Sequence, residues 1–213
     1  MSPILLLVHG WGFDASFWAP MRAALDGIEC VAWDLGFLGS PSYPALPSDR
    51  PVVAVGHSFG FLWLLRERPV VWQTLVAING FPRFVAGDDF PQGVPPRVID
   101  RMIGRFAETP EKVYADFLGR CGVDHPRALG LDHKTLADGL NGLRHWDGRS
   151  RIAALGPVDL ALAGRADPIA PMSLTESGFA GTDIRWHESG HLLPLQAPAW
   201  CAAQLRGLYG SLI

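Results

Sequence analysis

The sequence contains little cysteine, and this scarcity excludes two classes of small protein. Only three cysteines occur among 213 residues, at positions Cys30, Cys121 and Cys201. They are odd in number and widely scattered, so they predict neither a disulfide framework nor the paired spacing of a zinc site. Free thiols are typical of a reducing compartment, and we therefore expect a cytoplasmic protein without a structural metal.

A basic surplus and a long apolar run are also missing, and we expect no leader sequence. The net charge is −3, whereas a general nucleic-acid binder normally carries an excess of Lys and Arg. No apolar run is long enough to span a bilayer. The N-terminus leads directly into an apolar run without a basic region or a small-residue cleavage site, so we expect no signal peptide. With 48% hydrophobic residues, the chain can bury one full core, and we expect a soluble domain that binds neither nucleic acid nor membrane.

Short apolar runs separated by helical or loop segments indicate the strands of a parallel sheet. The runs are nearly continuous in apolar residues, which is the pattern of strands covered on both faces. Strands that alternate with helices place the chain in the α/β class. A helix is expected from an N-cap at Asp14 through Leu25, whereas Pro, Gly and Ser make residues 36–50 a loop. The predicted strands are residues 4–8, 30–33, 52–55, 74–78, 158–163 and 183–187.

Residues 81–154 interrupt this alternation and predict a helical cap. Thr109 followed by Pro110 is a helix start, because proline fits the first helical turn. Apolar residues recur at helical spacing in residues 98–106, 110–118 and 136–143. We expect residues 1–80 and 155–213 to form the core and residues 81–154 to form a lid over the strand ends. A helical extension without a role in the active site is the alternative.

The stretch Gly56-His57-Ser58-Phe59-Gly60 follows the third predicted strand and fits the pattern G-x-S-x-G. In this pattern a serine sits on a strained turn between a strand and a helix, with its hydroxyl exposed. The flanking glycines are needed because the backbone at such a turn passes too close to its neighbours for a Cβ. A strand before the turn and a helix-like run after it supply the required context, so Ser58 is the candidate nucleophile.

A serine hydroxyl is a weak nucleophile at neutral pH and needs a histidine base that an acid holds in place. On this type of turn the chain order is serine, acid, histidine, and each partner lies in a loop after a strand. Asp167 follows the fifth predicted strand, and His191 follows the sixth. Ser58, Asp167 and His191 are therefore the predicted catalytic triad. The alternatives are a turn residue at Asp167, which precedes a proline, and an unpaired loop histidine at His191.

Attack on a carbonyl places negative charge on its oxygen, so preorganised hydrogen-bond donors are required. The predicted donors are the backbone N–H groups of Phe59, directly after the nucleophile, and of Trp11, in the loop after the first strand. A tight turn is the alternative for that loop. His57 is expected to pack or to orient its neighbours, and Asp34, which precedes the serine, is expected to hold a turn.

The remaining histidines and glycines predict no metal and no cofactor. His125, His133 and His145 lie in the cap without the spacing of metal ligands. The chain also lacks a glycine-rich phosphate cradle. We therefore expect chemistry that needs neither a metal nor a cofactor.

Taken together, these motifs resemble the α/β-hydrolase family, whose fold is a mostly parallel sheet with a helical cap inserted before the acid-bearing strand. The general motifs are His9-Gly10-Trp11-Gly12, Gly56-His57-Ser58-Phe59-Gly60, Gly164-x-x-Asp167 and Gly190-His191-x-x-Pro194. Within this family the chain is similar to the pimeloyl-[acyl-carrier protein] methyl ester esterases of biotin synthesis. The closer likeness lies in Phe17-Trp18, in Asn79-Gly80-Phe81-Pro82-Arg83-Phe84 at the start of the cap, and in Trp146-Asp147-Gly148-Arg149 at its end.

The resemblance implies a serine carboxylic-ester hydrolase that removes the methyl group from a pimeloyl thioester on acyl carrier protein. It also implies that the acyl chain contacts Trp11, Phe59, Phe117 and Leu118. Basic cap residues of the family meet the acidic carrier protein. Arg97, Arg101 and Arg105 are the corresponding candidates, because a spacing of four places them on one face of a helix. An ordinary solvated face is the alternative for these arginines.

Two departures from the family pattern concern the sheet. The family's sheet has additional strands before the oxyanion loop, so we expect a sheet that is reduced at the N-terminus, and the crossover after Asp34 has lost its helix. The alternative functions among enzymes are a thioesterase, a small-ester esterase and a carbon–carbon bond hydrolase. The alternative from another class is a ligand receptor that keeps the pocket without turnover.

Overall fold

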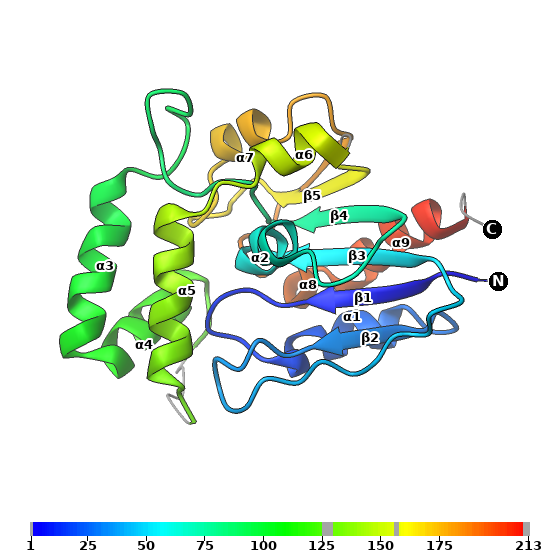
Figure 1. The fold of residues 1–213 in the computed structure, drawn as a ribbon, viewed down its shortest axis with the longest axis horizontal. Coiled ribbons are helices and arrows are strands. Elements are labelled where there is room, and N and C mark those ends of the chain that lie inside the picture. Colours follow the sequence, from blue (N-terminus) through cyan, green and yellow to red (C-terminus); the bar gives the residue numbers. More distant parts are fainter. Residues whose placement is uncertain (1, 125–129, 156–157, 211–213) are drawn as a thin grey trace.

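A six-stranded sheet forms the centre of the molecule (Figure 1). The computed structural model describes residues 2–124, 130–155 and 158–210. The strands lie in the order β2-β1-β3-β4-β5-β6, and each neighbouring pair is parallel. They are β1 (Ile4–Val8), β2 (Cys30–Trp33), β3 (Val52–His57), β4 (Thr74–Ile78), β5 (Leu160–Gly164) and β6 (Ile184–His187). The predicted parallel α/β sheet is therefore confirmed.

Alternate side chains of each central strand enter two separate cores. In β1, Ile4, Leu6 and Val8 belong to the core on one face, and Leu5 and Leu7 belong to the core on the other. This division follows from the strand itself, since successive side chains point to opposite faces. An apolar residue is needed at every position, which explains why these strands are unbroken apolar runs in the sequence.

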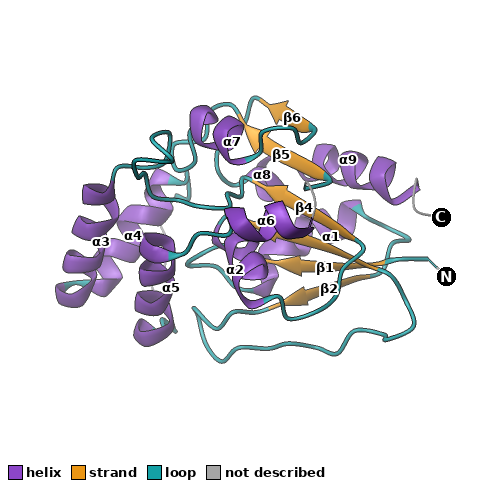
Figure 2. Ribbon diagram, turned by 45° about the horizontal axis from the view of Figure 1, so that its top comes forward, coloured by secondary structure: helices purple, strands orange, loops and turns teal. Residues whose placement is uncertain are grey.

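Helices cover both faces of the sheet (Figures 1 and 2). On one face, α1 (Ala19–Ala24), α8 (Leu193–Gln196) and α9 (Pro198–Gly210) pack against one another and supply Met21, Leu193 and Cys201 to the core. On the other face, α2 (Phe59–Glu67) and α7 (Met172–Gly178) supply Phe61 and Leu174. Within the described residues, no helix has both the length and the apolar character that crossing a membrane requires.

The predicted helix from Asp14 through Leu25 is divided into two parts. A 3₁₀ turn, η1 (Ala15–Trp18), comes first, and the Asp14 carboxylate caps it by accepting a hydrogen bond from the amide of Ser16 at 2.8 Å. The α-helix begins only at α1, where Pro20 stands in the first turn. Because proline lacks an N–H group and fits only the start of an α-helix, it marks a new beginning at this point.

The segment between β4 and β5, which we call the helical insertion, contains four helices in its described part. They are α3 (Pro96–Glu108), α4 (Pro110–Arg120), α5 (His133–His145) and α6 (Arg149–Leu155). The first three were expected from their apolar periodicity, whereas α6 has seven residues and buries none of them. α3 packs against both α4 and α5, and the three lie beyond the tips of the strand arrows (Figure 1).

The order in which successive strands are added to the sheet reverses at β1. β2 pairs with one edge of β1 and β3 pairs with the other, so the carboxyl ends of β1 and β3 flank a switch point. Open α/β sheets bind their ligands at such points. The crossover from β2 to β3, residues 34–51, is fully described and contains no helix, as its composition predicts.

Candidate active site

The stretch from Gly56 to Gly60 forms a sharp turn between β3 and α2. Ser58 has φ +51° and ψ −123°, a conformation that residues other than glycine rarely adopt. A Cβ at Gly56 would lie 2.4 Å from Cα of Phe61, and a Cβ at Gly60 would lie 2.3 Å from the carbonyl oxygen of His9. The two glycines therefore permit the close packing that holds the strained serine in place.

Ser58, His191 and Asp167 come together from three separate loops at the carboxyl end of the sheet. Oγ of Ser58 lies 3.0 Å from Nε2 of His191, and Nδ1 of His191 lies 2.8 Å from Oδ2 of Asp167. All three residues are buried. Because a carboxylate can only accept, Nδ1 of His191 carries the proton and Nε2 is free to accept the hydroxyl proton of Ser58. This arrangement can generate a serine nucleophile.

The Asp167 carboxylate forms hydrogen bonds both within its own turn and with His191. Its Oδ1 atom accepts hydrogen bonds from the amides of Ile169 at 2.7 Å and Ala170 at 2.9 Å. Its Oδ2 atom faces His191. The turn that the sequence offered as an alternative is thus present, and it directs the second oxygen toward the histidine.

Asn79 is a neighbour of the site that sequence reasoning missed as a functional residue. Its Nδ2 group donates to Oδ2 of Asp167 at 2.7 Å and also approaches the carbonyl oxygen of Gly190 at 3.4 Å. Asn79 directly follows β4, which pairs with the strand that precedes Asp167. Its φ is +46°, in a region that asparagine occupies more readily than most residues. Only its position after a strand could have indicated it.

The backbone amides of Trp11 and Phe59 lie after two adjacent strands, β1 and β3. In the described ranges of the chain, neither amide donates a hydrogen bond to a protein group. Both are therefore available to an oxygen atom of a ligand. The Trp11 indole is fixed separately, since Nε1 donates to the carbonyl of Leu136 on α5 at 2.8 Å and the ring packs edge-on against Phe117 at 4.9 Å. Trp11 thus connects the loop after β1 to the helical insertion.

A largely apolar pocket of about 550 Å³ lies over Ser58. Its wall combines core residues such as Trp11 and Ile169 with residues of the insertion such as Met102 and Phe117. Among the described residues that line it, Arg120 alone is charged. An apolar cavity beside one polar reacting group is typical of a site for an acyl chain.

The four residues predicted to contact an acyl chain divide into two pairs. Trp11 and Phe117 line the pocket. The Phe59 ring instead stacks on Trp146 with a centroid distance of 5.5 Å, and Leu118 is buried in the hydrophobic core. Phe117 therefore faces the cavity, whereas the side chain of Leu118, about 100° further around α4, enters the core.

The three arginines predicted to face a partner lie along the exposed side of α3. Ile99 and Phe106 are buried on the same helix, so α3 has the expected amphipathic character. Arg105 pairs with Asp116 of α4 at 3.2 Å. Arg97 and Arg101 are exposed.

His57 has a structural environment beside the site. Its Nε2 group donates to the carbonyl of His191 at 2.9 Å, and its ring stacks on Phe17 at 4.5 Å. Burial, together with the neighbouring His191, holds the pKa of His57 well below its usual value. His57 therefore stays neutral and supports the backbone of His191.

Asp34 holds a turn, as its position in the sequence predicts. It accepts hydrogen bonds from the amides of Ala15 at 3.1 Å and Gly36 at 2.8 Å. Burial raises the pKa of Asp34, but its contact with His9 and these two amides outweigh burial and lower the pKa to about 2.

The two cap histidines that the structure describes do not gather into a cluster. His133 pairs with Glu111 at 3.1 Å, and His145 is exposed at the end of α5. His125 lies outside the described residues. No group of three or more potential metal ligands occurs in residues 2–124, 130–155 and 158–210.

Curated proteins and solved structures resemble the chain, although no family model matches it. It is 30% identical over 197 residues to the pimeloyl-[acyl-carrier protein] methyl ester esterase of Legionella pneumophila, covering 82% of this chain and 81% of that protein. It is also 30% identical over 205 residues to the biotin biosynthesis bifunctional protein BioHC of Cellvibrio japonicus, covering 82% of this chain and 40% of that protein. An esterase from Exiguobacterium antarcticum has the same fold, with a TM-score of 0.81 at 19% identity over 99% of this chain and 92% of that one.

Proposed function

The chain belongs to the pimeloyl-[acyl-carrier protein] methyl ester esterase family, and on this premise we propose that it is a serine carboxylic-ester hydrolase that removes the methyl group from pimeloyl-[acyl-carrier protein]. The observation that carries the proposal is the hydrogen-bonded series from Ser58 through His191 to Asp167, at 3.0 and 2.8 Å. Because Ser58 lines the apolar pocket, an acyl chain in that pocket would bring its ester group to the nucleophile.

In the proposed mechanism, Oγ of Ser58 attacks the ester carbonyl while Nε2 of His191 takes the hydroxyl proton. The carbonyl oxygen becomes an oxyanion, which the free amides of Trp11 and Phe59 would bind. The intermediate collapses as His191 returns the proton to the methoxide, so that methanol leaves and an acyl-serine remains. His191 then deprotonates a water molecule that attacks the acyl-serine; as the bond between the acyl carbon and Oγ breaks, His191 returns the proton to Ser58, and the free carboxylate is released. Asp167 holds the histidine in the required tautomer throughout.

We assign residues 81–154 to a cap that forms the far wall of the acyl site. Phe117 and Trp11 would contact the aliphatic chain directly, since both line the pocket. Phe59 would contribute its amide rather than its ring, and Leu118 would support Phe117 from the core side of α4. The apolar wall fits an unbranched chain better than a polar substrate.

The remaining parts of the proposal concern the partner and the setting. Arg97, Arg101 and Arg105 would attract an acidic carrier protein to the outer face of α3, since complementary charge accelerates encounter. We also propose a cytoplasmic setting, because all three cysteines are free thiols.

Complementation of a biotin auxotroph that lacks its methyl ester esterase tests the physiological role. We expect the wild-type gene to restore growth and Ser58→Ala to fail. Growth that the Ser58→Ala variant restores equally well would contradict the proposed nucleophile. A wild-type gene that fails, although the protein accumulates, would contradict the proposed substrate.

An assay in vitro separates the ester reaction from thioester cleavage. With a methyl pimeloyl thioester of a carrier protein, the proposed enzyme releases methanol and leaves the thioester intact, whereas a thioesterase releases the free thiol. Ser58→Ala should lower methanol release on the order of 10⁴-fold or more. Labelling of Ser58 by a fluorophosphonate would separate either enzyme from a receptor without turnover.

A further inference from the structure

One wall of the pocket over Ser58, which we call the acyl pocket, is a single stretch of chain. Residues 91–95 line the pocket in an unbroken run. They end a loop, residues 85–95, that leads directly into α3. This loop is fully described and contains neither a helix nor a strand, apart from isolated bridges between its own residues. Its place over the pocket therefore depends on the contacts that fix the loop as a whole.

The loop folds back on itself and forms a compact unit. The amide of Ala86 donates to the carbonyl of Val94 at 2.9 Å, and the amide of Val94 donates to the carbonyl of Phe84 at 2.8 Å. A Cβ at Gly93 would lie 2.4 Å from the amide nitrogen of Ala86, so glycine permits the two arms to touch. Contacts that hold the tip of the loop therefore hold the wall as well.

Two arginines and two aspartates hold the tip, and we call them the charge quartet: Arg83, Asp89, Asp147 and Arg149. Nη1 of Arg83 lies 2.9 Å from Asp89 and 3.2 Å from Asp147. Arg149 donates to both oxygens of Asp147, from Nε at 3.0 Å and from Nη2 at 2.6 Å. It also pairs with the Asp89 carboxylate and donates to the Asp89 carbonyl at 3.2 Å. Each arginine therefore pairs with both aspartates.

Both guanidinium groups also contact Phe90, the residue after Asp89. The ring centroid of Phe90 lies 5.1 Å from the guanidinium carbon of Arg149 and 5.9 Å from that of Arg83. Phe90 is buried in the hydrophobic core. An isolated surface ion pair contributes little to stability. A bidentate pair within a network, joined to two cation–π contacts, is the arrangement in which such charges do fix a geometry.

The charge quartet lies where the helical insertion leaves the core and returns to it. Arg83 follows β4, whereas Asp147 and Arg149 precede β5. The two segments are joined directly, since Arg83 and Asp147 form an antiparallel bridge and the amide of Gly148 donates to the carbonyl of Pro82 at 2.7 Å. The tip of the loop is thus fastened to the base of the insertion.

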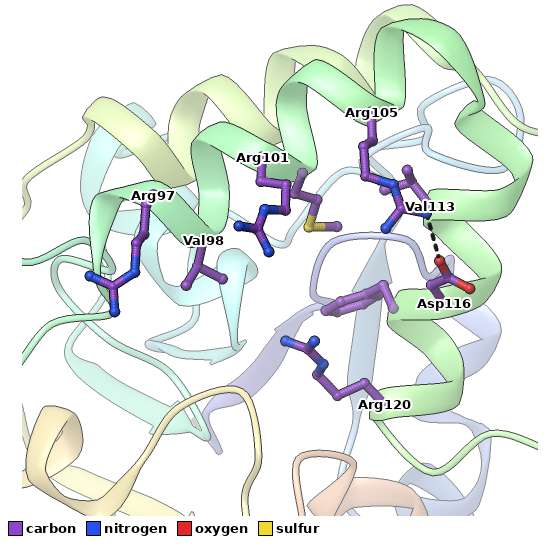
Figure 3. Close-up of a pocket in the computed structure, with 9 residues that line it drawn as sticks. Arg97, Val98, Arg101, Arg105, Val113, Asp116 and Arg120 are labelled. Carbon is purple, nitrogen blue, oxygen red and sulfur yellow. Dashed lines mark hydrogen bonds and ion pairs between the residues drawn. The ribbon is translucent and has the colours of Figure 1, made fainter.

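The place of the loop also affects α3, which begins at the next residue. Val98, Ile99 and Met102 of α3 line the acyl pocket. A second cavity, about 270 Å³ in volume, lies between α3 and α4, and arginines of both helices point into it (Figure 3): Arg97, Arg101, Arg105 and Arg120. The three arginines of α3 line that cavity and not the acyl pocket. The residues of α3 that would meet an acyl chain are therefore apolar, and they continue the wall that the loop begins.

We propose that the charge quartet positions the wall at residues 91–95 and thereby determines the preference of the enzyme for a long acyl chain. The inference rests on the proposed function, because it takes the acyl chain to lie in the acyl pocket. A methylene group gains affinity only from apolar atoms in contact with it, so a wall that moves away forfeits this gain. All four members of the quartet are described and none of them lines the pocket, so they are positioning residues that act through the loop.

Kinetics with two methyl esters of different chain length test the proposal. Methyl heptanoate and methyl acetate share the reacting group, so the ratio of their kcat/KM values measures recognition of the acyl chain. We expect Arg149→Gln to lower this ratio about tenfold, the loss that about two methylene contacts would give. It should change kcat/KM for methyl acetate by less than about twofold.

A second variant keeps the test independent of one substitution. Asp89→Asn preserves the shape of an exposed side chain, should lower the ratio in the same way, and carries the test if Arg149→Gln does not fold. The double variant should fall no further than Arg149→Gln, because the two residues act through one network.

Arg50→Gln is the matched control. Arg50 also forms an ion pair, with Glu29, and donates to the backbone carbonyls of Ser2 at 2.8 Å and Pro3 at 3.0 Å. It precedes β3 and so lies at the end of the sheet opposite to Ser58. Loss of this arginine should lower the unfolding free energy without changing the ratio of the two esters.

Two further measurements need no turnover. Calorimetry with dimethyl pimelate compares Ser58→Ala with Ser58→Ala/Arg149→Gln, and we expect about tenfold weaker binding in the second protein. Amide hydrogen exchange in residues 84–95 should be faster in Arg149→Gln than in the wild type or in Arg50→Gln, because opening of the loop exposes its amides.

An unchanged ester ratio in both Arg149→Gln and Asp89→Asn would overturn the proposal. With faster exchange it would show that the loop does not select the chain, and with unchanged exchange that the quartet does not hold the loop. An equal fall of the ratio in Arg50→Gln would assign the effect to lost stability and would also overturn it. Failure of the proposed function is a separate result, namely a wild type that hydrolyses neither ester. The affinities for dimethyl pimelate then decide the role of the quartet, and equal affinities of the two Ser58→Ala proteins would contradict it.

Discussion

Asn79 and Asp167 are joined by a buried hydrogen bond of 2.7 Å although they lie 88 residues apart in the chain. The Asp167 carboxylate accepts four hydrogen bonds. Its Oδ2 atom accepts from the side chains of Asn79 and His191, and its Oδ1 atom accepts from two backbone amides. A carboxylate offers about four lone-pair positions, so each has a partner. The orientation of Asp167 is therefore fixed before any substrate binds, and through Asp167 so is the ring of His191.

Replacement of Asn79 should lower the rate more than it lowers substrate binding. Asn79→Gly removes one donor to the carboxylate without backbone strain, since glycine adopts φ +46° readily. A hydrogen bond to a charged group contributes roughly 1.5–3 kcal/mol, so we expect kcat to fall about tenfold or more with little change in KM. The measurement is steady-state hydrolysis of a small methyl ester.

Asn79→Asp sharpens the same test. The substitution keeps the shape of the side chain but places a second carboxylate beside Asp167, and two carboxylates in one site cannot both ionise easily. We therefore expect a larger loss of kcat than in Asn79→Gly. Circular dichroism of both variants controls for folding, and full activity in Asn79→Asp would show that the contact does not position the acid.

Gly139 on α5 leaves the space that the Trp11 indole occupies. A Cβ at this position would lie 2.7 Å from Cδ1 of Trp11 and 3.0 Å from Cε1 of Phe37. The indole cannot easily yield, because it is hydrogen-bonded to the carbonyl of Leu136. We expect Gly139→Ala to cost roughly 1–3 kcal/mol of unfolding free energy through overpacking, and to lower kcat by up to about 10²-fold if the Trp11 amide is displaced.

Gly104→Ala on α3 is the matched control for this prediction. A Cβ at Gly104 meets no atom within 4 Å, so alanine should stabilise the helix by up to about 1 kcal/mol without a change in kcat. Chemical denaturation and ester hydrolysis are measured for both variants. If Gly139→Ala behaved like Gly104→Ala, the loop after β1 would not depend on its contact with the insertion.

Elements that depend on local patterns could be predicted from the sequence. The strands β1, β3, β4 and β5 are mostly apolar runs because the sheet is covered on both faces there, and apolar periodicity together with the Thr109-Pro110 helix start indicates α3, α4 and α5. The G-x-S-x-G pattern is also local, and a Cβ at Gly56 would meet Phe61 within the same turn, although the atoms that exclude a Cβ at Gly60 belong to Val8 and His9. Apart from that last contact, these features follow from residues that are near one another in the chain.

Features that depend on contacts between distant residues could not be predicted. Asn79 meets Asp167 only because β4 and β5 pair, and Arg120 faces the α3 arginines only because α3 packs against α4. α6 has no buried face to give it a periodic pattern. The sequence alone could also not separate Phe117, which lines the acyl pocket, from Leu118, which does not, because this difference depends on what packs against each side of α4.

His57 should make the protein sensitive to acid. Its pKa is held well below the usual value by burial and by the neighbouring His191, so the unfolded chain binds a proton at a pH where the folded chain does not. Its contribution is therefore complete above pH ~6.5 and is lost as the pH falls below that value. We expect the unfolding free energy of the wild type to fall by up to about 1.4 kcal/mol per pH unit below pH ~6.5, relative to His57→Gln.

Urea denaturation at several values between pH 5 and 8 provides this measurement, with His57→Gln as the reference that lacks the titrating group. The difference between the two proteins should be constant above pH ~6.5 and change only below it. A difference that does not vary with pH would mean that His57 takes up its proton equally in the folded and the unfolded chain, contrary to its buried environment.

The exposed charge of α3 should make the reaction with a carrier-linked ester depend on salt. Screening shortens the range of charge interactions from about 10 Å at 0.1 M salt to about 3 Å at 1 M. We therefore expect kcat/KM for the carrier-linked methyl ester to fall steeply over this range, while kcat/KM for dimethyl pimelate changes little. Arg97→Glu is the informative variant, because Arg97 is exposed on α3 and does not line the pocket over Ser58. At low salt it should lower the ratio of carrier-linked to small-ester activity about tenfold, and the effect should disappear at 1 M salt. Arg22→Glu changes the net charge of the chain equally on a distant helix, so an equal loss in that variant would contradict a role for α3 in attracting the partner.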